Sequence, residues 1–131
     1  EVIERFPLNV RPIALAADRG RIIWVTEDGK IMARRHGEDS VAQLGLVPPG
    51  NVTKLSTNRD SWAAATDRGL VISGNGTRRA ETVALLDGPV HILDVRTNLI
   101  RVQTKNGATY SIDGRDVRLH REARFEAPHA R

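Results

Sequence analysis

Apolar and polar residues alternate with a period of two in three separate stretches of this chain, which is the pattern of β-strands rather than helices. Each stretch lies in a 15-residue segment in which a leucine precedes a threonine by eleven positions and the threonine precedes a glycine by three. The segments run from 15 to 29, from 55 to 69 and from 93 to 107, so they are spaced 40 and then 38 residues apart. Three matched segments at such a spacing predict an internal repeat.

Each repeat predicts four antiparallel strands. The shared glycine closes a tight hairpin, as in Asp28-Gly29 and Asn106-Gly107, because glycine adopts a positive φ without steric strain. We expect a strand before this segment, a strand within it, a returning strand after the hairpin and a fourth strand downstream. The first strands are expected at 13–17, 52–57 and 90–95, the returning strands at 30–34, 70–73 and 108–112, and the fourth at 41–47, 81–86 and 116–120. No segment predicts a helix, so the expected fold class is all-β, with three blade-like repeats of the β-propeller type.

The alternation places three residues of each repeat on one strand face. These residues are Ile22, Trp24 and Thr26; Trp62, Ala64 and Thr66; and Ile100, Val102 and Thr104. Their volumes compensate, because Trp62 stands where the other repeats have isoleucine and Ala64 stands where the first repeat has Trp24. This compensation predicts a shared core. The alternative is that the two tryptophans form a platform for a ligand.

After the returning strand, the first repeat continues with a glycine-rich element. Gly37, Gln43, Leu44 and Gly45 match the pattern Gly-x-Asn-x-x-Gly-Gln-Leu-Gly, with Asp39 for the asparagine and Ala42 for the second glycine. The second repeat keeps Gly74, and the third has Asp113-Gly114 without the Gln-Leu-Gly. Over residues 12–120 the chain thus resembles the regulator-of-chromosome-condensation repeats.

This resemblance implies a β-propeller. The best-known members of the family act in nucleotide exchange on a small GTPase and in chromatin binding, and others are protein-binding platforms. No element of this sequence supports nucleotide exchange or chromatin binding, whereas a role as a protein-binding platform needs only the propeller fold.

We expect a single β-propeller-like domain over residues 1–131, with repeats at about 12–50, 51–88 and 89–122. Three blades are fewer than the four to eight of a typical closed propeller. The chain is therefore part of a longer propeller, half of a six-bladed dimer or a closed three-bladed ring. Residues 1–10 are a candidate closing strand and 123–131 a tail. Because the chain begins with Glu1, we expect an excised domain or a processed chain.

The composition narrows the available chemistry. The chain has 131 residues, of which 40% are hydrophobic, and no cysteine. Disulfides, thiolate zinc sites, iron–sulfur clusters and cysteine nucleophiles are thereby excluded. Only 4% of the residues are aromatic, so the core must be mainly aliphatic. No apolar stretch approaches the roughly 20 residues that span a membrane, and the first residues do not have a signal-peptide pattern. The predominance of arginine over lysine is compatible with a GC-rich bacterial source.

The net charge of +4 comes largely from arginine clusters. Two basic clusters follow the returning strands of the first and second repeats at comparable places, and two further arginines lie in the third. These candidate binding residues are Arg34, Arg35, His36, Arg78, Arg79, Arg115 and Arg118. On one rim of a propeller they would contact an acidic protein surface, a phosphate backbone or anionic lipid headgroups. Alternatively, they only make the rim soluble.

We predict no catalytic, metal-binding or cofactor-binding residue. The four histidines lie in different places without zinc-site spacing: His36, His91 at a strand start, His120, and His129 in the tail. Segment 74–79 lacks the Lys-Ser/Thr of a phosphate-binding loop, and segment 113–116 lacks the ligands of a calcium loop.

We therefore expect a non-enzymatic protein-interaction or assembly module in a larger protein or complex, with a protein partner or a second copy. The alternative is nucleic-acid or other polyanion binding through the arginine rim, without stacking on single strands because exposed aromatics are lacking.

Overall fold

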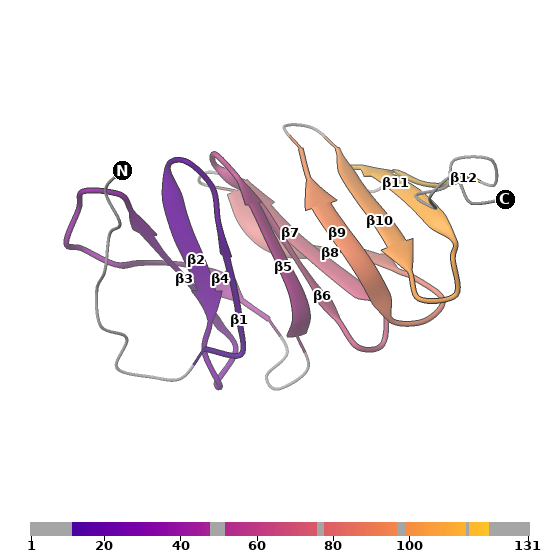
Figure 1. The fold of residues 1–131 in the computed structure, drawn as a ribbon, viewed down its shortest axis with the longest axis horizontal. Coiled ribbons are helices and arrows are strands. Elements are labelled where there is room, and N and C mark those ends of the chain that lie inside the picture. Colours follow the sequence, from indigo (N-terminus) through magenta and orange to yellow (C-terminus); the bar gives the residue numbers. More distant parts are fainter. Residues whose placement is uncertain (1–11, 48–51, 76–77, 97–98, 115, 121–131) are drawn as a thin grey trace, which may run out of the picture.

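The computed structural model describes residues 12–47, 52–75, 78–96, 99–114 and 116–120, and this part of the chain is all-β. Twelve strands form three four-stranded antiparallel sheets, each with its strands in chain order, as the sequence predicted (Figure 1). The first sheet contains β1 (Ala14–Ala17), β2 (Arg21–Val25), β3 (Lys30–Arg35) and β4 (Ala42–Leu46). The second contains β5 (Val52–Asn58), β6 (Ser61–Thr66), β7 (Leu70–Asn75) and β8 (Arg78–Leu85). The third contains β9 (Val90–Val95), β10 (Ile100–Thr104), β11 (Thr109–Asp113) and β12 (Asp116–His120).

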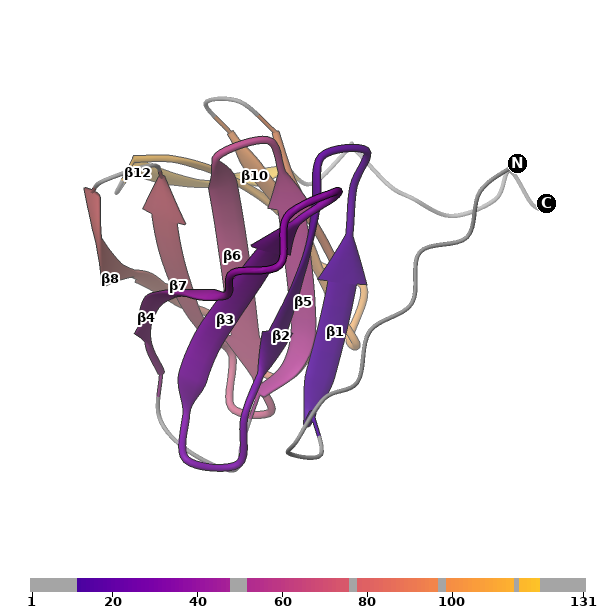
Figure 2. The ribbon, with the colours of Figure 1, turned by 90° about the vertical axis from the view of Figure 1, so that its left-hand side faces the viewer.

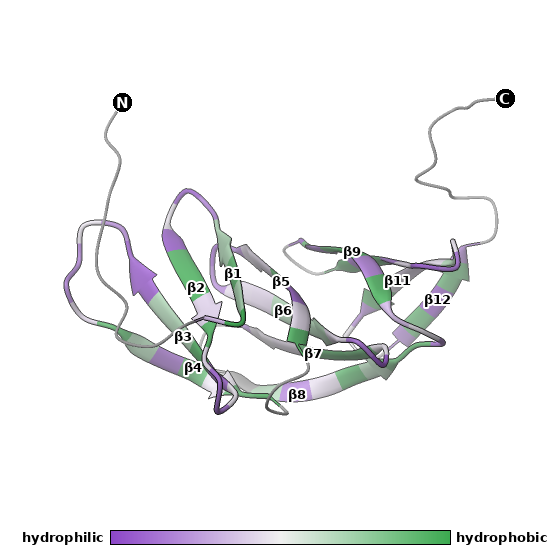
Figure 3. Cartoon of the chain, turned by 60° about the horizontal axis from the view of Figure 1, so that its bottom comes forward, coloured by the Kyte–Doolittle hydropathy of each residue, from purple (hydrophilic) through white to green (hydrophobic). Residues whose placement is uncertain are grey.

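The three sheets stand side by side in a curved row (Figures 1 and 3). The first strand of each sheet lies on the inside of the curve, where β1 packs against β5 and β5 against β9. The two hydrophobic clusters of the described residues lie between the first and second sheets and between the second and third. The described residues therefore form an open arc and not the closed three-bladed ring that the sequence had left open. The candidate closing strand at 1–10 and the tail at 123–131 lie outside the described residues.

The threonine and glycine shared by the repeats build the same hairpin three times. Thr66 shows the arrangement, since its carbonyl accepts a hydrogen bond from the Gly69 amide at 3.1 Å and its hydroxyl accepts one from the Leu70 amide at 3.2 Å. The equivalent threonines, Thr26 and Thr104, are also buried. Gly69 has a φ of 90°. Because L-residues are strained in this conformation, the motif needs glycine at its last position.

The predicted face contributes to the two hydrophobic clusters in the second and third sheets but not in the first, although Trp24 is itself only 4% exposed. Trp62 and Ala64 face the first sheet, and Ile100 and Val102 face the second. In the first sheet, Ile23 and Val25 supply the cluster with the second sheet. Ile22 and Trp24 alternate with them on β2 and lie on the outer face, because their repeat position points away from the following sheet and no described sheet precedes β1–β4.

Trp62 is the centre of the first interface. It is 2% exposed and packs against two glycines, one from each sheet. A Cβ atom at Gly74 would lie 2.5 Å from Trp62 Nε1, and one at Gly45 would lie 3.3 Å from Trp62 Cζ2. The indole is enclosed by backbone, so it belongs to the core and forms no ligand platform.

Candidate functional site

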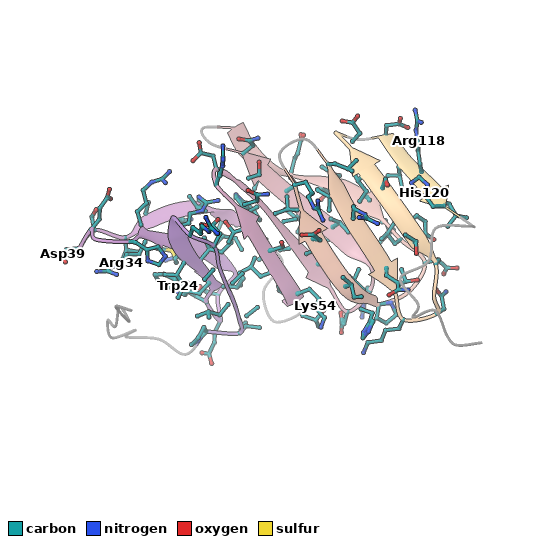
Figure 4. All side chains as sticks on the ribbon, turned by 45° about the horizontal axis from the view of Figure 1, so that its top comes forward. Trp24, Arg34, Asp39, Lys54, Arg118 and His120 are labelled. Carbon is teal, nitrogen blue, oxygen red and sulfur yellow. The ribbon has the colours of Figure 1, made fainter. Side chains whose placement is uncertain are left out.

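The two adjacent arginines of the predicted rim point to opposite faces of β3. Arg34 lies buried on the outer face of the first sheet, with its Nη2 3.8 Å from Asp39 Oδ1 (Figure 4). Arg35 points to the inner face and donates a hydrogen bond of 2.9 Å to Asp60 of the second sheet. His36 follows the strand and donates from its backbone amide to the Gly20 carbonyl at 3.0 Å. These three residues therefore do not share one surface.

Of the other predicted rim residues, Arg118 is the one whose side chain is described. Arg78 and Arg79 begin β8, where a loop was expected, and their side chains lie outside the described part. Arg115 is also outside it. Arg118 lies on β12 at the opposite end of the arc, with Nε 3.2 Å from Asp116 Oδ2 (Figure 4). Each of the arginines 34, 35 and 118 thus has a carboxylate neighbour, which gives no support to an open cationic rim.

A polar cluster joins the first two sheets at one end of their interface. Asp18, in the turn between β1 and β2, accepts hydrogen bonds from the Gly20 and Arg21 amides of its own turn at 2.7 and 3.0 Å. Its second oxygen accepts hydrogen bonds from the Thr57 hydroxyl at 3.1 Å and from the Arg59 amide at 2.9 Å. One carboxylate therefore holds the turns of two neighbouring sheets together.

The guanidinium of Arg21 fills the space beneath this carboxylate. The side chain is buried, and its Nε donates to the Thr57 hydroxyl at 3.0 Å. Its Nη2 donates to the Ser61 carbonyl at 3.2 Å. Burial lowers the pKa of Arg21, while the nearby Asp18 charge opposes that effect. This network is a structural link, and the sequence analysis did not identify it.

Asp18 predicts a dependence of stability on pH. Partial burial raises the pKa of its carboxyl, but the four hydrogen bonds that it accepts outweigh burial and hold the pKa below the ordinary 3.8. The stabilisation by the carboxylate is therefore fully present above that ordinary value and is lost as the pH falls through the lower pKa of the folded state. We expect Asp18→Asn to reduce the free energy of unfolding by about 1–2 kcal/mol at pH 7.

Urea denaturation of the wild type and Asp18→Asn at a series of pH values tests this expectation. The difference between the two proteins should shrink as the pH falls below about 4. Asp116→Asn is the matched control, because Asp116 makes an exposed ion pair and its loss should change stability by less than about 0.5 kcal/mol. A difference that stays constant with pH would assign the effect to packing rather than to charge.

The equivalent place between the second and third sheets holds a pocket. Ser61 occupies the repeat position of Arg21, and Asn75 that of Arg35. These shorter side chains leave a cavity of about 200 Å³, whose lining includes Ser61, Ser73, Asn75, Ile100, Ile112 and Asp113. The signal in the sequence is the exchange of arginine for serine between two aligned repeats, which matches no known motif.

The two ends of the arc present different faces. Figure 2 looks onto the first sheet, whose outer face carries the apolar residues Leu15, Ile22, Trp24, Met32 and Leu46 beside the polar Lys30, Arg34 and Gln43. Of the apolar residues, Trp24 is buried. Leu15 and Leu46 are 51% and 61% exposed. The outer face of the third sheet is mostly polar and carries Asp94, Arg101, Gln103, Ser111, Arg118 and His120 (Figures 3 and 4). The outer face of the first sheet is therefore the more apolar of the two, although it also carries Lys30 and Arg34.

No group of three or more histidine, aspartate or glutamate side chains placed to hold a metal ion occurs in the described ranges. Among the histidines, His91 is exposed at the start of β9, and Nε2 of His120 lies 2.7 Å from the Ser111 hydroxyl. No helix suited to crossing a membrane is found in the described part of the chain.

Antiparallel four-stranded sheets whose first strands meet on the inside of a curve define a β-propeller-type fold. Solved structures of propeller-type proteins confirm this class. The computationally designed Ika4 protein is similar with a TM-score of 0.64 and 16% identity, over 94% of this chain and 78% of that chain. YCF48 bound to D1 peptide is similar with a TM-score of 0.64 and 16% identity over 88% of this chain. The nidogen/laminin complex is similar with a TM-score of 0.61 and 12% identity over 86% of this chain.

The chain spans only 42% of the YCF48 chain and 49% of the nidogen/laminin chain. No protein-family model matches the sequence, and no curated protein matches it. The likeness therefore establishes the fold, and the regulator-of-chromosome-condensation family itself is not shown.

Proposed function

We propose that this chain is a non-catalytic protein-interaction module that works as part of a larger protein or complex. The observation that carries the proposal is the apolar outer face of the first sheet. On that face, Leu15 and Leu46 are more than half exposed, and Ile22 and Met32 are partly exposed. Within the described residues no sheet packs against this face.

The repeat indicates what such a face is for. The residues equivalent to Ile22 and Trp24 are Trp62 and Ala64 in the second sheet, which the first sheet covers. In the third sheet they are Ile100 and Val102, which the second sheet covers. Apolar sheet faces are stable when another layer removes them from water. The outer face of the first sheet also has apolar residues at these positions, and we infer that a partner surface covers its exposed part around Leu15 and Leu46.

A different protein fits this face better than a second copy of the chain. A six-bladed dimer would place the polar outer face of one third sheet against the apolar outer face of the other first sheet. Arg101 and Gln103 would then lose hydration against aliphatic side chains, which is unfavourable without new partners. YCF48 bound to D1 peptide and the nidogen/laminin complex are propeller-type proteins whose structures contain a peptide or protein partner, which supports this class of function.

The test uses charge substitution on the apolar face. The double variant Leu15→Glu/Leu46→Glu should fold and lose the partner. Leu85→Glu is the matched control, because Leu85 has the repeat position of Leu46 on the second sheet and is 73% exposed. The amount of partner protein that each variant captures is measured, and light scattering then shows whether the complex is stoichiometric.

We expect a complex with the wild type and with Leu85→Glu, and none with the double variant. The chain alone should be monomeric in sedimentation experiments. If the wild type and the double variant retain the same proteins, the face is not an interaction site. Salt-sensitive binding to DNA at low ionic strength would instead favour the polyanion alternative.

A further inference from the structure

The two interfaces between sheets are built on one frame, and one of the places where they differ lies at the end near Arg21. In the first interface, Arg21 on β2 and Arg35 on β3 are paired across the first sheet and reach towards the second. In the second interface, the paired positions hold Ser61 on β6 and Asn75 on β7. The second interface therefore lacks the arginine that fills the first, and the pocket of about 200 Å³ lies there.

The pocket is lined by two hydroxyl groups without a protein partner among the described residues. Ser61 and Ser73 are only 7% and 6% exposed, and both line it. In the described part of the chain, neither hydroxyl forms a hydrogen bond to another protein group. Both hydroxyls reach solvent through the pocket, since the described side-chain atom that is buried without a hydrogen-bond partner is Thr109 Oγ1. Two such hydroxyls in one pocket indicate a site for a polar occupant.

The mouth of the pocket carries a carboxylate that forms no ion pair with another described residue. Arg96 lines the mouth, but its Nε is 2.9 Å from Asp94 Oδ2, so this cation is already paired. Asp113 is exposed at the mouth and makes no ion pair within the described residues. The Asp113 carboxylate favours a cationic group beside it.

The volume limits the size of the occupant. Pockets for drug-sized ligands have roughly 300–1,000 Å³, whereas a cavity of about 150 Å³ holds a benzene molecule. The pocket of about 200 Å³ therefore suits a single planar group. Ile100 and Ile112 form an apolar wall that can lie against such a plane.

We propose that this pocket binds the guanidinium group of an arginine side chain that a partner protein presents. The inference rests on the proposed function only for the partner being a protein. A guanidinium is planar and donates several hydrogen bonds in fixed directions, which matches two hydroxyls and a carboxylate around a flat apolar wall. The repeat supplies the precedent, because the same place in the first interface is filled by the guanidinium of Arg21.

The probe is N-acetyl-L-arginine amide, added to the isotope-labelled chain and followed by NMR shifts of the backbone amides. We expect saturable shifts at Ser61, Ser73, Leu99 and Asp113. The citrulline analogue has the same shape without the charge, and the lysine analogue has the charge without the plane. Both should bind at least several-fold more weakly. Equal binding of all three probes, or shifts spread over the whole surface, would overturn the proposal.

Substitutions in the pocket sharpen the test. Asp113→Asn should weaken the binding of the arginine probe about three- to tenfold, because it removes a charge-assisted contact. Ser61→Arg should restore the side chain of the first interface, fill the pocket and abolish binding. Ser61→Ala is a smaller change that preserves the fold, and it should weaken binding of the arginine probe through the loss of one hydroxyl. Ser40→Ala, an exposed serine in the loop before β4, is the control and should bind like the wild type.

The result of the probe experiment can be distinguished from the result of the partner-capture experiment. Partner capture depends on Leu15 and Leu46 at the end of the arc, whereas the probe experiment needs no partner. Unchanged binding of the probe to Ser61→Arg would remove the pocket as a guanidinium site and leave the partner face unaffected. Loss of partner capture with intact probe binding would remove the partner face and leave the pocket as a guanidinium site.

Discussion

Trp62→Ala is expected to lower the free energy of unfolding by about 3–5 kcal/mol, the range for removing a large buried aromatic side chain. Trp62 lies between the first two sheets and is almost fully buried. Alanine would leave a void between Gly45 and Gly74, and glycine has no side chain with which to fill it. Chemical denaturation followed by circular dichroism measures the loss.

The same contact can be tested from the other side. Gly74→Ala should destabilise the wild type by about 1–3 kcal/mol, because the new methyl group would lie 2.5 Å from Trp62 Nε1. In the Trp62→Ala background the same change should cost much less, since the void accepts the methyl group. A double-mutant cycle gives this coupling directly. If the two effects simply add, the close approach of Trp62 and Gly74 does not determine stability.

Local chemistry explains why the strands were predictable. The hairpin at Thr66 and Gly69 is set by residues three apart in the chain, and alternation defines the strands around it. Information of this kind is contained in a short stretch of sequence. The repeat then transfers one hairpin to the other two, so the three four-stranded sheets followed from the pattern alone.

The orientation of a face depends on neighbours that the local pattern does not contain. Trp24 and Ala64 have the same repeat position, yet Ala64 lies between two sheets and Trp24 lies on the outer face of the first. Alternation gives the set of residues on a face but not the layer that covers it. The sequence therefore predicted the shared core and misplaced the part contributed by the first sheet.

The predicted arginine rim is distributed over several surfaces for a similar reason. Adjacent residues on a strand point to opposite faces, so Arg34 and Arg35 are separated by the sheet itself. Their carboxylate neighbours, Asp39 and Asp60, come from other loops that the sequence does not place beside them. The pocket was missed because it is defined by the absence of a side chain, which appears only when Ser61 is compared with Arg21.

Gly69→Ala is expected to be the most damaging of the hairpin substitutions. The left-handed backbone conformation alone costs an alanine about 1–2 kcal/mol. In addition, a Cβ at Gly69 would lie 2.5 Å from the Leu86 carbonyl oxygen and 2.6 Å from that of Gly88. Because these are backbone atoms, the chain itself has to move, and overpacking of this kind costs a further 1–3 kcal/mol or so. Thermal and urea denaturation measure the total.

Gly107→Ala separates the two contributions. Gly107 has the same place in the third hairpin and a φ of 94°, but a Cβ there would meet nothing within 4 Å. This variant should therefore lose only the conformational part, about 1–2 kcal/mol. The end of the second repeat is also held at Gly69, because the Gly69 carbonyl accepts a hydrogen bond from the Leu86 amide at 2.8 Å. Equal losses for the two variants would mean that the packing of this segment on Gly69 contributes nothing, and that strain in the turn explains both.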